Sequence, residues 1–288
     1  MNRLALGTVQ FGLVYGVANL EGKVSRQTAK AMLELAAEHR LDTLDTAISY
    51  GDSEACLGDA GTAGFKVVSK LPPLPQGCKA VDTWVQEQLA MTLARLGAKS
   101  IYGLLLHRPE QLLEDIGAEL YRALQRLQEA GQVLKIGISI YEPAQLDALI
   151  PRYRFDLVQA PLNLVDRRLA ISGWLQRLKV GGVEVHARSA FLQGLLLMPK
   201  SAIPARFAPW AEMWDRWHGW LGAHDVTAVQ ACLAYPLSFS GIDRVVVGAE
   251  SVGQLSEILL AASVGGLPDF PDLQCDAQDL INPARWSL

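Results

Sequence analysis

The stretch LYRALQRLQEAGQVLKIGIS, residues 120–139, contains a helix pattern, a turn residue and a strand pattern in direct succession. Leu120, Leu124 and Leu127 recur at intervals of four and three, which places them on one face of a helix. Gly131 is a favourable residue for ending that helix, and the short apolar segment after it is typical of a buried strand. The stretch therefore predicts a helix that leads directly into a strand, which is the repeating unit of an α/β fold.

The same alternation extends outward from this stretch in both directions. Short, nearly continuous apolar segments are separated by longer amphipathic ones, as expected for parallel strands that helices cover on both faces. The expected strands are Leu4–Val9, Thr43–Thr46, Lys66–Ser69, Gly103–Leu106, Lys135–Ser139, Leu157–Ala160, Val183–Ala187 and Arg244–Val247. The helices expected between them include Thr28–Arg40 with Ser25 as its N-cap, Arg167–Lys179, Val226–Leu237 and Ser251–Ala262.

This order of elements predicts a (β/α)8 TIM barrel. The chain has 288 residues, half of them hydrophobic, and we expect residues 1–288 to form one domain of this kind. A doubly wound sheet is the alternative, but it would normally carry a Gly-x-Gly-x-x-Gly motif after an early strand, and the sequence has none. The segment from Gly265 to Leu288, which carries Pro and Asp, is expected to be irregular.

Composition and charge exclude several classes of function. The formal net charge of −4 provides no electrostatic footprint for nucleic acid or an anionic membrane. No apolar run approaches the roughly 20 residues that span a bilayer, and the start of the chain is a poor secretory signal, so a cytoplasmic location is expected. The cysteines, at positions 56, 78, 232 and 275, are too scattered for a zinc site or a disulfide framework. We therefore expect no metal.

Polar side chains end three consecutive predicted strands. Asp45 ends the second strand, Lys70 the third and His107 the fourth, while Tyr50 follows shortly after Asp45. Active sites of barrels lie at the carboxyl ends of the strands, so these side chains are expected to meet at one rim. Each residue taken singly is better explained as a solvated loop residue, a surface ion pair, a rim histidine or part of a turn. Their placement at neighbouring strand ends favours catalysis instead.

The set has the chemistry needed to reduce a carbonyl group. An acid must protonate the oxygen while hydride adds to the carbon, and the Tyr50 hydroxyl could be that acid. The ammonium of Lys70 would stabilise the phenolate, and Asp45 would keep Lys70 charged and oriented. His107 would donate a hydrogen bond that orients the carbonyl. A Schiff-base lyase that uses Lys70 is an alternative, but the neighbouring carboxylate would keep the amine protonated and weakly nucleophilic.

Several stretches, spread over nearly the whole chain, match one known family. They are Gly7-Thr8, Asp45–Glu54 (DTAISYGDSE), Leu57-Gly58, Ser69-Lys70, Leu106–Pro109 (LHRP), Gly131–Ser139, Gln159 with Asn163, Ser189–Leu196 and Val246–Ala249. Together they resemble the aldo-keto reductases. The resemblance implies a barrel enzyme that uses a nicotinamide cofactor to interconvert small carbonyl compounds and alcohols. It also implies the tetrad Asp45, Tyr50, Lys70 and His107, with Tyr50 as general acid/base.

The resemblance also implies where the cofactor would lie. Ser139 and Gln159 would bind the nicotinamide carboxamide, and Ser189 and Leu192 would line the path of the pyrophosphate. The residues around Gly248 to Glu257 would meet the adenosine end. The whole expected set is Gly7, Thr8, Ser139, Gln159, Arg188, Ser189, Leu192, Gly248, Gln254 and Glu257.

Three departures from the family pattern bear on cofactor binding. Ile140 stands where many relatives have an asparagine that holds the carboxamide, and Arg188 where many have an aromatic residue stacked on the nicotinamide. A guanidinium is planar and can stack as well. Gly248, Ala249 and Gln254 stand roughly where relatives that hold the 2′-phosphate of NADP have basic residues. From the habit of the family we expect NADP(H) rather than NAD(H), with use of NADH left open.

The aromatic residues of the sequence allow two interpretations. Trp210, Trp214, Trp217 and Trp220 form a helical stripe, which we expect to pack on the barrel, and the alternative is an aromatic wall for a ring-bearing substrate. Phe11, Tyr15 and the C-terminal tail are further candidates for the pocket.

As for function, a regulatory or sensor protein that binds the cofactor without turnover is the alternative, although a pure binder needs no acid at position 50. The sequence carries no information on the oligomeric state.

Overall fold

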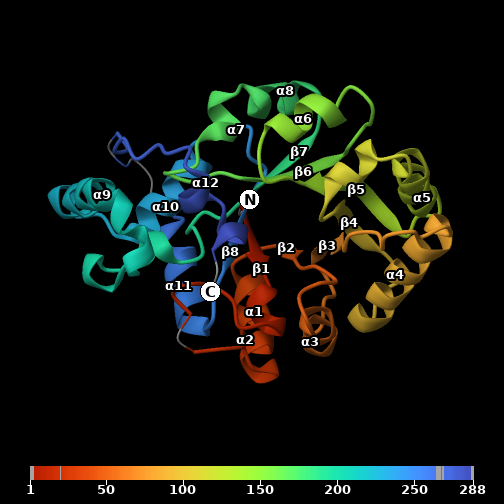
Figure 1. Ribbon diagram of the computed structural model, residues 1–288. Coiled ribbons are helices and arrows are strands. Elements are labelled where there is room, and N and C mark those ends of the chain that lie inside the picture. Colours follow the sequence, from red (N-terminus) through yellow and green to blue (C-terminus); the bar gives the residue numbers. More distant parts are fainter. Residues whose placement is uncertain (1–2, 20, 264–266, 268, 287–288) are drawn as a thin grey trace.

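Eight parallel strands close into a barrel in the order in which they occur along the chain (Figure 1). The protein is represented by a computed structural model that describes residues 3–19, 21–263, 267 and 269–286. Its strands are β1 (Leu4–Gly7), β2 (Thr43–Asp45), β3 (Lys66–Leu71), β4 (Ile101–Leu106), β5 (Val133–Ser139), β6 (Leu157–Pro161), β7 (Glu184–Arg188) and β8 (Arg244–Gly248). Because β1 also pairs with β8, the sheet has no free edge. The predicted (β/α)8 fold is confirmed.

Helices surround the barrel (Figure 1). The α-helices are α1 (Val9–Gly12), α2 (Arg26–Glu38), α3 (Ser53–Ala60), α4 (Val81–Leu96), α5 (Gly117–Glu129), α6 (Ala144–Leu149), α7 (Arg168–Ile171), α8 (Trp174–Val180), α9 (Ala211–His224), α10 (Ala228–Leu237), α11 (Val252–Ala261) and α12 (Gln278–Ile281). Short 3-10 turns are η1 (Pro109–Leu113), η2 (Leu195–Leu197), η3 (Lys200–Ala202), η4 (Ala205–Trp210) and η5 (Pro283–Arg285). Ser25 caps α2 as expected, since its side chain accepts a hydrogen bond from the Thr28 N–H.

Two sequence-based expectations about these elements were wrong. The single helix expected at Arg167–Lys179 is two helices, α7 and α8, because Gly173 adopts a φ of 76° that an α-helix does not allow. The tail is not irregular throughout, since it contains α12 and η5, and Trp286 packs its ring 4.9 Å from that of Phe207. Gly265 and Leu288, which bound that expectation, lie outside the described residues.

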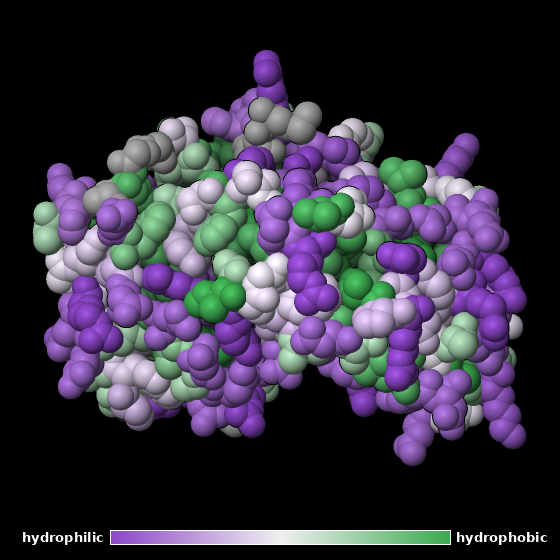
Figure 2. All heavy atoms as spheres, turned by 90° about the horizontal axis from the view of Figure 1, so that it is seen from above, coloured by the Kyte–Doolittle hydropathy of each residue, from purple (hydrophilic) through white to green (hydrophobic). Residues whose placement is uncertain are grey.

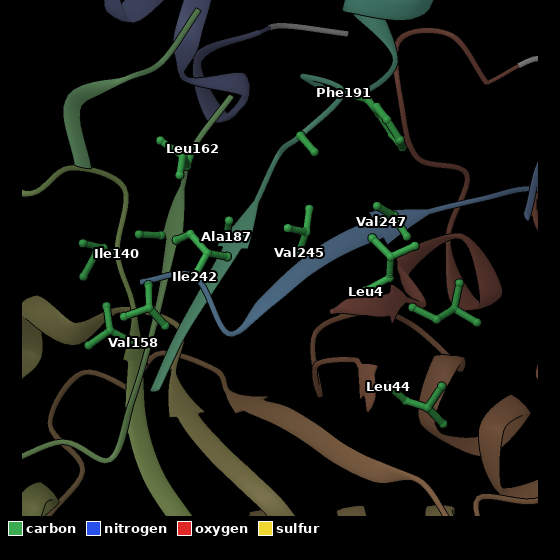
Figure 3. Close-up of a cluster of buried hydrophobic side chains, with 14 of the residues drawn as sticks. Leu4, Leu44, Ile140, Val158, Leu162, Ala187, Phe191, Ile242, Val245 and Val247 are labelled. Carbon is green, nitrogen blue, oxygen red and sulfur yellow. The ribbon is translucent and has the colours of Figure 1, made fainter. Parts of the chain in front are cut away.

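Alternate residues of each strand face two different environments. Outward-facing side chains join the helices in one large apolar cluster, and Figure 3 shows members of it from β1, β2, β6, β7 and β8. Inside the barrel, Val68, Leu105 and Leu157 form a small cluster of their own. Burial of both faces explains why the strands read as continuous apolar runs rather than as alternating ones.

On the face shown in Figure 2, hydrophilic residues predominate and hydrophobic ones occur in small groups. Within the described residues, no helix is both long and apolar enough to cross a bilayer.

Candidate active site

The turn after β2 that carries Tyr50 is held against the end of β1 by a group of buried hydroxyls. The Ser53 hydroxyl donates to the carbonyl of Thr8 (2.8 Å) and lies 3.1 Å from the hydroxyl of Thr46. The Thr8 hydroxyl in turn donates to the carbonyl of Asp45 at 3.0 Å. Each of these groups is fully or almost fully buried, so each hydrogen bond is costly to break. The turn is therefore held in a defined position relative to Asp45.

Close packing of two glycines brings the β1 loop against this turn. A Cβ atom on Gly12 would lie 1.8 Å from the carbonyl oxygen of Tyr50. Gly51 has a φ of 57°, in the left-handed region, and a Cβ there would lie 2.6 Å from the carbonyl oxygen of Gly12. Both contacts are with backbone, which cannot turn aside as a flexible side chain can.

A Gly12→Ala substitution is therefore expected to displace Tyr50. We expect a loss of about 1–3 kcal/mol in the free energy of unfolding, measured by denaturant titration, because the backbone must move to admit the methyl group. The matched control is Gly219→Ala in α9, where nothing lies within 4 Å of the added atom and a small stabilisation is expected. Equal stability of the two variants would contradict this picture of the turn.

The Lys70 side chain is buried behind the wall of the site, and its ammonium forms an ion pair and a further hydrogen bond there. Its ammonium donates to Oδ1 of Asp45 (2.7 Å) and to the carbonyl of Thr46 (2.8 Å), and its side chain is only 1% exposed. The other carboxylate oxygen of Asp45 accepts a hydrogen bond from Nε2 of Gln159 at 2.6 Å. Burial would lower the pKa of Lys70, but the charge of Asp45 and the neighbouring Tyr50 outweigh it, and the net pKa is raised. Lys70 therefore carries a positive charge.

The Tyr50 ring lies close to two other members of the predicted tetrad, Lys70 and His107. Nζ of Lys70 is 5.1 Å from the centre of the Tyr50 ring. The His107 ring meets it edge-on, with 5.9 Å between the ring centres. The proximity of Tyr50 is among the effects that raise the pKa of Lys70. The structure therefore brings together the four side chains that the strand ends predicted.

His107 is held in its neutral form. Burial, followed by the positive charges of Lys70 and Arg188, lowers its pKa to about 4 against the opposing effect of Asp45. A neutral imidazole has one N–H donor and one acceptor nitrogen. His107 can therefore donate one hydrogen bond into the site without adding a third positive charge to it.

The protonation of His107 should be visible in solution. We expect an NMR titration of its ring to have a midpoint near pH 4, against 6.5 for an unperturbed histidine. Because folding lowers this pKa, the associated stability is fully present above pH 6.5 and is lost as the pH falls toward 4. A His107→Asn variant identifies the resonance and should remove this part of the acid destabilisation. A midpoint above 6.5 would contradict the burial described here.

Glu54, at the start of α3, supports the strand that carries Lys70. Its side chain is 2% exposed and accepts hydrogen bonds from Ser69 (2.6 Å) and Thr92 (3.2 Å). It also forms an ion pair with Arg95 at 2.6 Å. One buried carboxylate thus joins α3, α4 and β3, and it orients the residue directly before Lys70.

The tetrad opens into a cavity of about 760 Å³ at the carboxyl end of the strands, a size typical of ligand sites. Asp45, Tyr50 and His107 line it, whereas Lys70 lies behind them. The residues expected to bind cofactor that line the cavity are Gly7, Thr8, Ser139, Gln159, Arg188, Ser189, Gly248, Gln254 and Glu257. Their placement is compatible with that role, which stays a prediction.

Comparison with known proteins decides the family. The model of the aldo/keto reductase family matches residues 3–269. The chain belongs to this family. Membership assigns this aldo/keto reductase to the oxidoreductases, as the sequence predicted. No curated protein matches the chain.

Solved structures share the fold of this aldo/keto reductase. The holo form of an aldo-keto reductase from Bacillus halodurans is 20% identical, with a TM-score of 0.74 over 92% of this chain and 88% of that one. The glycerol dehydrogenase from Gluconobacter oxydans is also 20% identical, with a TM-score of 0.69 over 93% of this chain and 88% of that one. At this identity the likeness concerns the barrel alone.

Some residues of this aldo/keto reductase lie where the sequence did not place them. Leu192 was expected to line the cavity, but its side chain is fully buried in the core and is not part of the lining. It has a φ of 49°, so the backbone turns there. Ile140 is likewise buried in the core (Figure 3), so it offers no substitute for an amide.

Of the aromatic residues considered for the pocket of this aldo/keto reductase, some line the cavity and others pack elsewhere. The tryptophan stripe lies on and just before α9, at the outer edge of the ring of helices (left in Figure 1), and none of the four residues lines the cavity. Trp217 is fully buried and donates to the carbonyl of Leu196 at 3.0 Å, so the stripe packs as expected. Phe11 is buried away from the cavity, whereas Tyr15 and the tail residues Pro283 and Ala284 line it.

Sequence reasoning missed several lining residues of this aldo/keto reductase. Gln10, Tyr141 and Gln193 line the cavity but were not predicted to do so, whereas Glu250 lies within the segment from Gly248 to Glu257 that was expected at the adenosine end of the cofactor. Gln10 is a polar residue that follows the end of β1. The criterion that found the tetrad, a polar side chain just beyond a strand end, would have found Gln10 as well.

Arg188 occupies the end of β7 in a fixed orientation. Its guanidinium donates to the carbonyl of Ile140 (2.9 Å) and to the hydroxyl of Ser189 (3.1 Å), and it lies 4.7 Å from the centre of the Tyr141 ring. Stacking on an aromatic ring leaves the other face of a planar guanidinium able to stack as well. Arg188 can thus offer a flat cationic surface to a bound ring.

Proposed function

We propose that the protein reduces aldehydes or ketones to alcohols, or catalyses the reverse reaction, with a nicotinamide cofactor. The observation that carries the proposal is the place of Tyr50 at the cavity wall, with the Lys70 ammonium 5.1 Å from its ring centre and the neutral His107 beside it. A site that only binds a ligand needs no proton donor at position 50, and the buried Lys70 ammonium lies next to that side chain. This ammonium is useful where a phenolate has to be stabilised.

Each member of the tetrad has a separate task in this proposal. Tyr50 would transfer its hydroxyl proton to the carbonyl oxygen of the substrate while hydride adds to the carbonyl carbon. The phenolate left on Tyr50 would be stabilised by the Lys70 ammonium, whose charge Asp45 maintains. The neutral His107 would donate a hydrogen bond to the same oxygen and so orient the substrate. In the reverse direction Tyr50 would accept the alcohol proton.

The cavity has residues that fit a dinucleotide. A bound reduced nicotinamide supplies the hydride. Ser139 and Gln159 lie beside the tetrad and offer amide and hydroxyl groups to a carboxamide, while Arg188 offers its planar face. Gln10 also lines the cavity, and its buried Oε1 has no hydrogen-bond partner among the described residues, so it is free to accept a hydrogen bond from a ligand.

Two measurements test the proposal. A fluorescence titration with NADH and with NADPH should show that at least one of them binds, and oxidation of the bound cofactor should then be followed by absorbance with a panel of aldehydes and ketones. We expect oxidation with at least one carbonyl. Tight binding without oxidation for any of them would favour a cofactor sensor, and failure of both cofactors to bind would contradict the proposal altogether.

A further inference from the structure

One part of the cavity wall is formed by the end of β8 and the start of α11. Gly248, Glu250, Gln254 and Glu257 line it there. The segment is internally fixed, because the Gln254 side chain accepts a hydrogen bond from the Glu250 N–H (2.8 Å) and the Ser251 side chain accepts one from the Gln254 N–H (3.2 Å). The two carboxylates are therefore presented by a defined backbone.

This part of the cavity carries negative charge and no compensating cation. Glu250 and Glu257 are acidic, and Glu21 lies close enough to raise the pKa of Glu250, after the larger effect of burial. Among the described residues that line the cavity, Arg188 is the only lysine or arginine. Its guanidinium is committed to Ile140 and Ser189 on the side of β5 and β7.

Gln10 adds a second, independent observation. Its side chain is 9% exposed and lines the cavity, and its buried Oε1 has no partner among the described residues. A Cβ on Gly248 would lie 2.7 Å from Nε2 and 3.0 Å from Oε1 of Gln10, so the glycine allows the amide to lie over the end of β8. The amide thus places an unsatisfied acceptor in the same part of the cavity as the two carboxylates.

We propose that Gln10, Glu250 and Glu257 bind the adenosine ribose of the cofactor through its free hydroxyls, and that the protein therefore selects NADH over NADPH. The inference rests on the proposed function, in which the nicotinamide lies beside the tetrad. It replaces the expectation of NADP(H) that the family habit suggested.

The hydrogen-bonding groups of the two cofactors explain why the protein would select NADH over NADPH. The ribose of NAD(H) has free 2′- and 3′-hydroxyls that donate hydrogen bonds, and ionised carboxylates and an amide oxygen only accept them. An acidic side chain on the ribose 2′-hydroxyl is a known mode of NAD recognition. The 2′-phosphate of NADP(H) has acceptor oxygens and negative charge instead, so it would meet carboxylates of like charge with no lysine or arginine among the described residues of this segment to balance them.

Binding measurements test the inference without reference to turnover. Dissociation constants for NADH and NADPH are measured by fluorescence titration at one ionic strength, and those for ADP and 2′,5′-ADP by competition against NADH. We expect NADH to bind at least tenfold more tightly than NADPH, and ADP at least tenfold more tightly than 2′,5′-ADP. The second pair lacks the nicotinamide and therefore reports on the ribose end alone.

Substitution of Glu250 and Glu257 by neutral glutamine tests whether these two carboxylates bind the ribose. The double variant Glu250→Gln/Glu257→Gln should reduce the preference for NADH at least tenfold, and each single variant should reduce it in part. Glu212→Gln on α9, an exposed acid that does not line the cavity, is the matched control and should leave the preference unchanged. Thermal unfolding of each variant checks that it is folded.

The outcomes separate this inference from the proposed function. NADPH binding as tightly as NADH, or more tightly, would overturn the inference and leave the proposed function standing. A folded double variant that keeps the wild-type preference would also overturn it. Failure of both dinucleotides to bind would overturn the inference together with the proposed function.

Discussion

A Tyr50→Phe variant is expected to lose between a hundredfold and ten-thousandfold in the rate of carbonyl reduction, the usual range for removal of a general acid, roughly 10²–10⁴. The phenyl ring would keep the edge contact with His107 and the position over Lys70. Only the proton donor would be removed, so the dissociation constant of the cofactor should change little. The measurement is the oxidation of reduced cofactor with a carbonyl on which the wild-type protein is active.

The control for this variant separates the hydroxyl of Tyr50 from tyrosine hydroxyls in general. Tyr121→Phe on α5 removes a hydroxyl that donates to the carbonyl of Arg154 at 2.7 Å. Tyr121 does not line the cavity. We expect this variant to retain activity. A Tyr50→Phe variant that turned over like the wild type would show that Tyr50 is not the acid.

A Lys70→Met variant is expected to lose about 3–5 kcal/mol in the free energy of unfolding, the usual cost of removing one partner of a buried ion pair. The pair has 1% and 5% of its side-chain area exposed, so solvent cannot replace the lost ammonium. Asp45 would keep only its hydrogen bond from Gln159. Activity should be lost as well, because a phenolate on Tyr50 would have no neighbouring positive charge.

The double variant Lys70→Met/Asp45→Asn distinguishes the two effects. Neutralising the carboxylate removes the uncompensated charge, so most of the lost stability should return in denaturant unfolding while the activity stays low. Asp45→Asn alone completes the double-mutant cycle. Purely additive losses of stability would show that the two charges do not depend on each other.

Much of the barrel could be predicted because its signals are local. A strand buried on both faces needs a short apolar run, and a helix on the barrel needs an apolar face of period 3.6, so both can be found in a few consecutive residues. The helix expected at Arg167–Lys179 shows the limit of this reasoning. Its apolar residues continue across Gly173, but the glycine adopts a positive φ and divides the segment into two helices.

The positions at neighbouring strand ends were predictable from the order of the strands, whereas the course of a loop such as that around Leu192 was not. Asp45, Lys70 and His107 end neighbouring strands, and parallel pairing places neighbouring strand ends together without further information. Leu192 lies on a loop, where a positive φ turns the backbone and its side chain is buried in the core instead of lining the cavity. Loop dihedrals of this kind follow from packing against distant segments.

By itself, the sequence determined the order of strands and helices, the family and the residues that form the tetrad, because each depends on residue types at short, regular spacing. Only the tertiary structure decided that Gln10 lies over Gly248 and that Arg188 is the only cation among the described residues that line the cavity. Gln10 and Gly248 are 238 positions apart, and they meet because β1 pairs with β8 when the barrel closes. The groups that surround a bound cofactor therefore come together only when the barrel closes, and no single segment of the chain contains all of them.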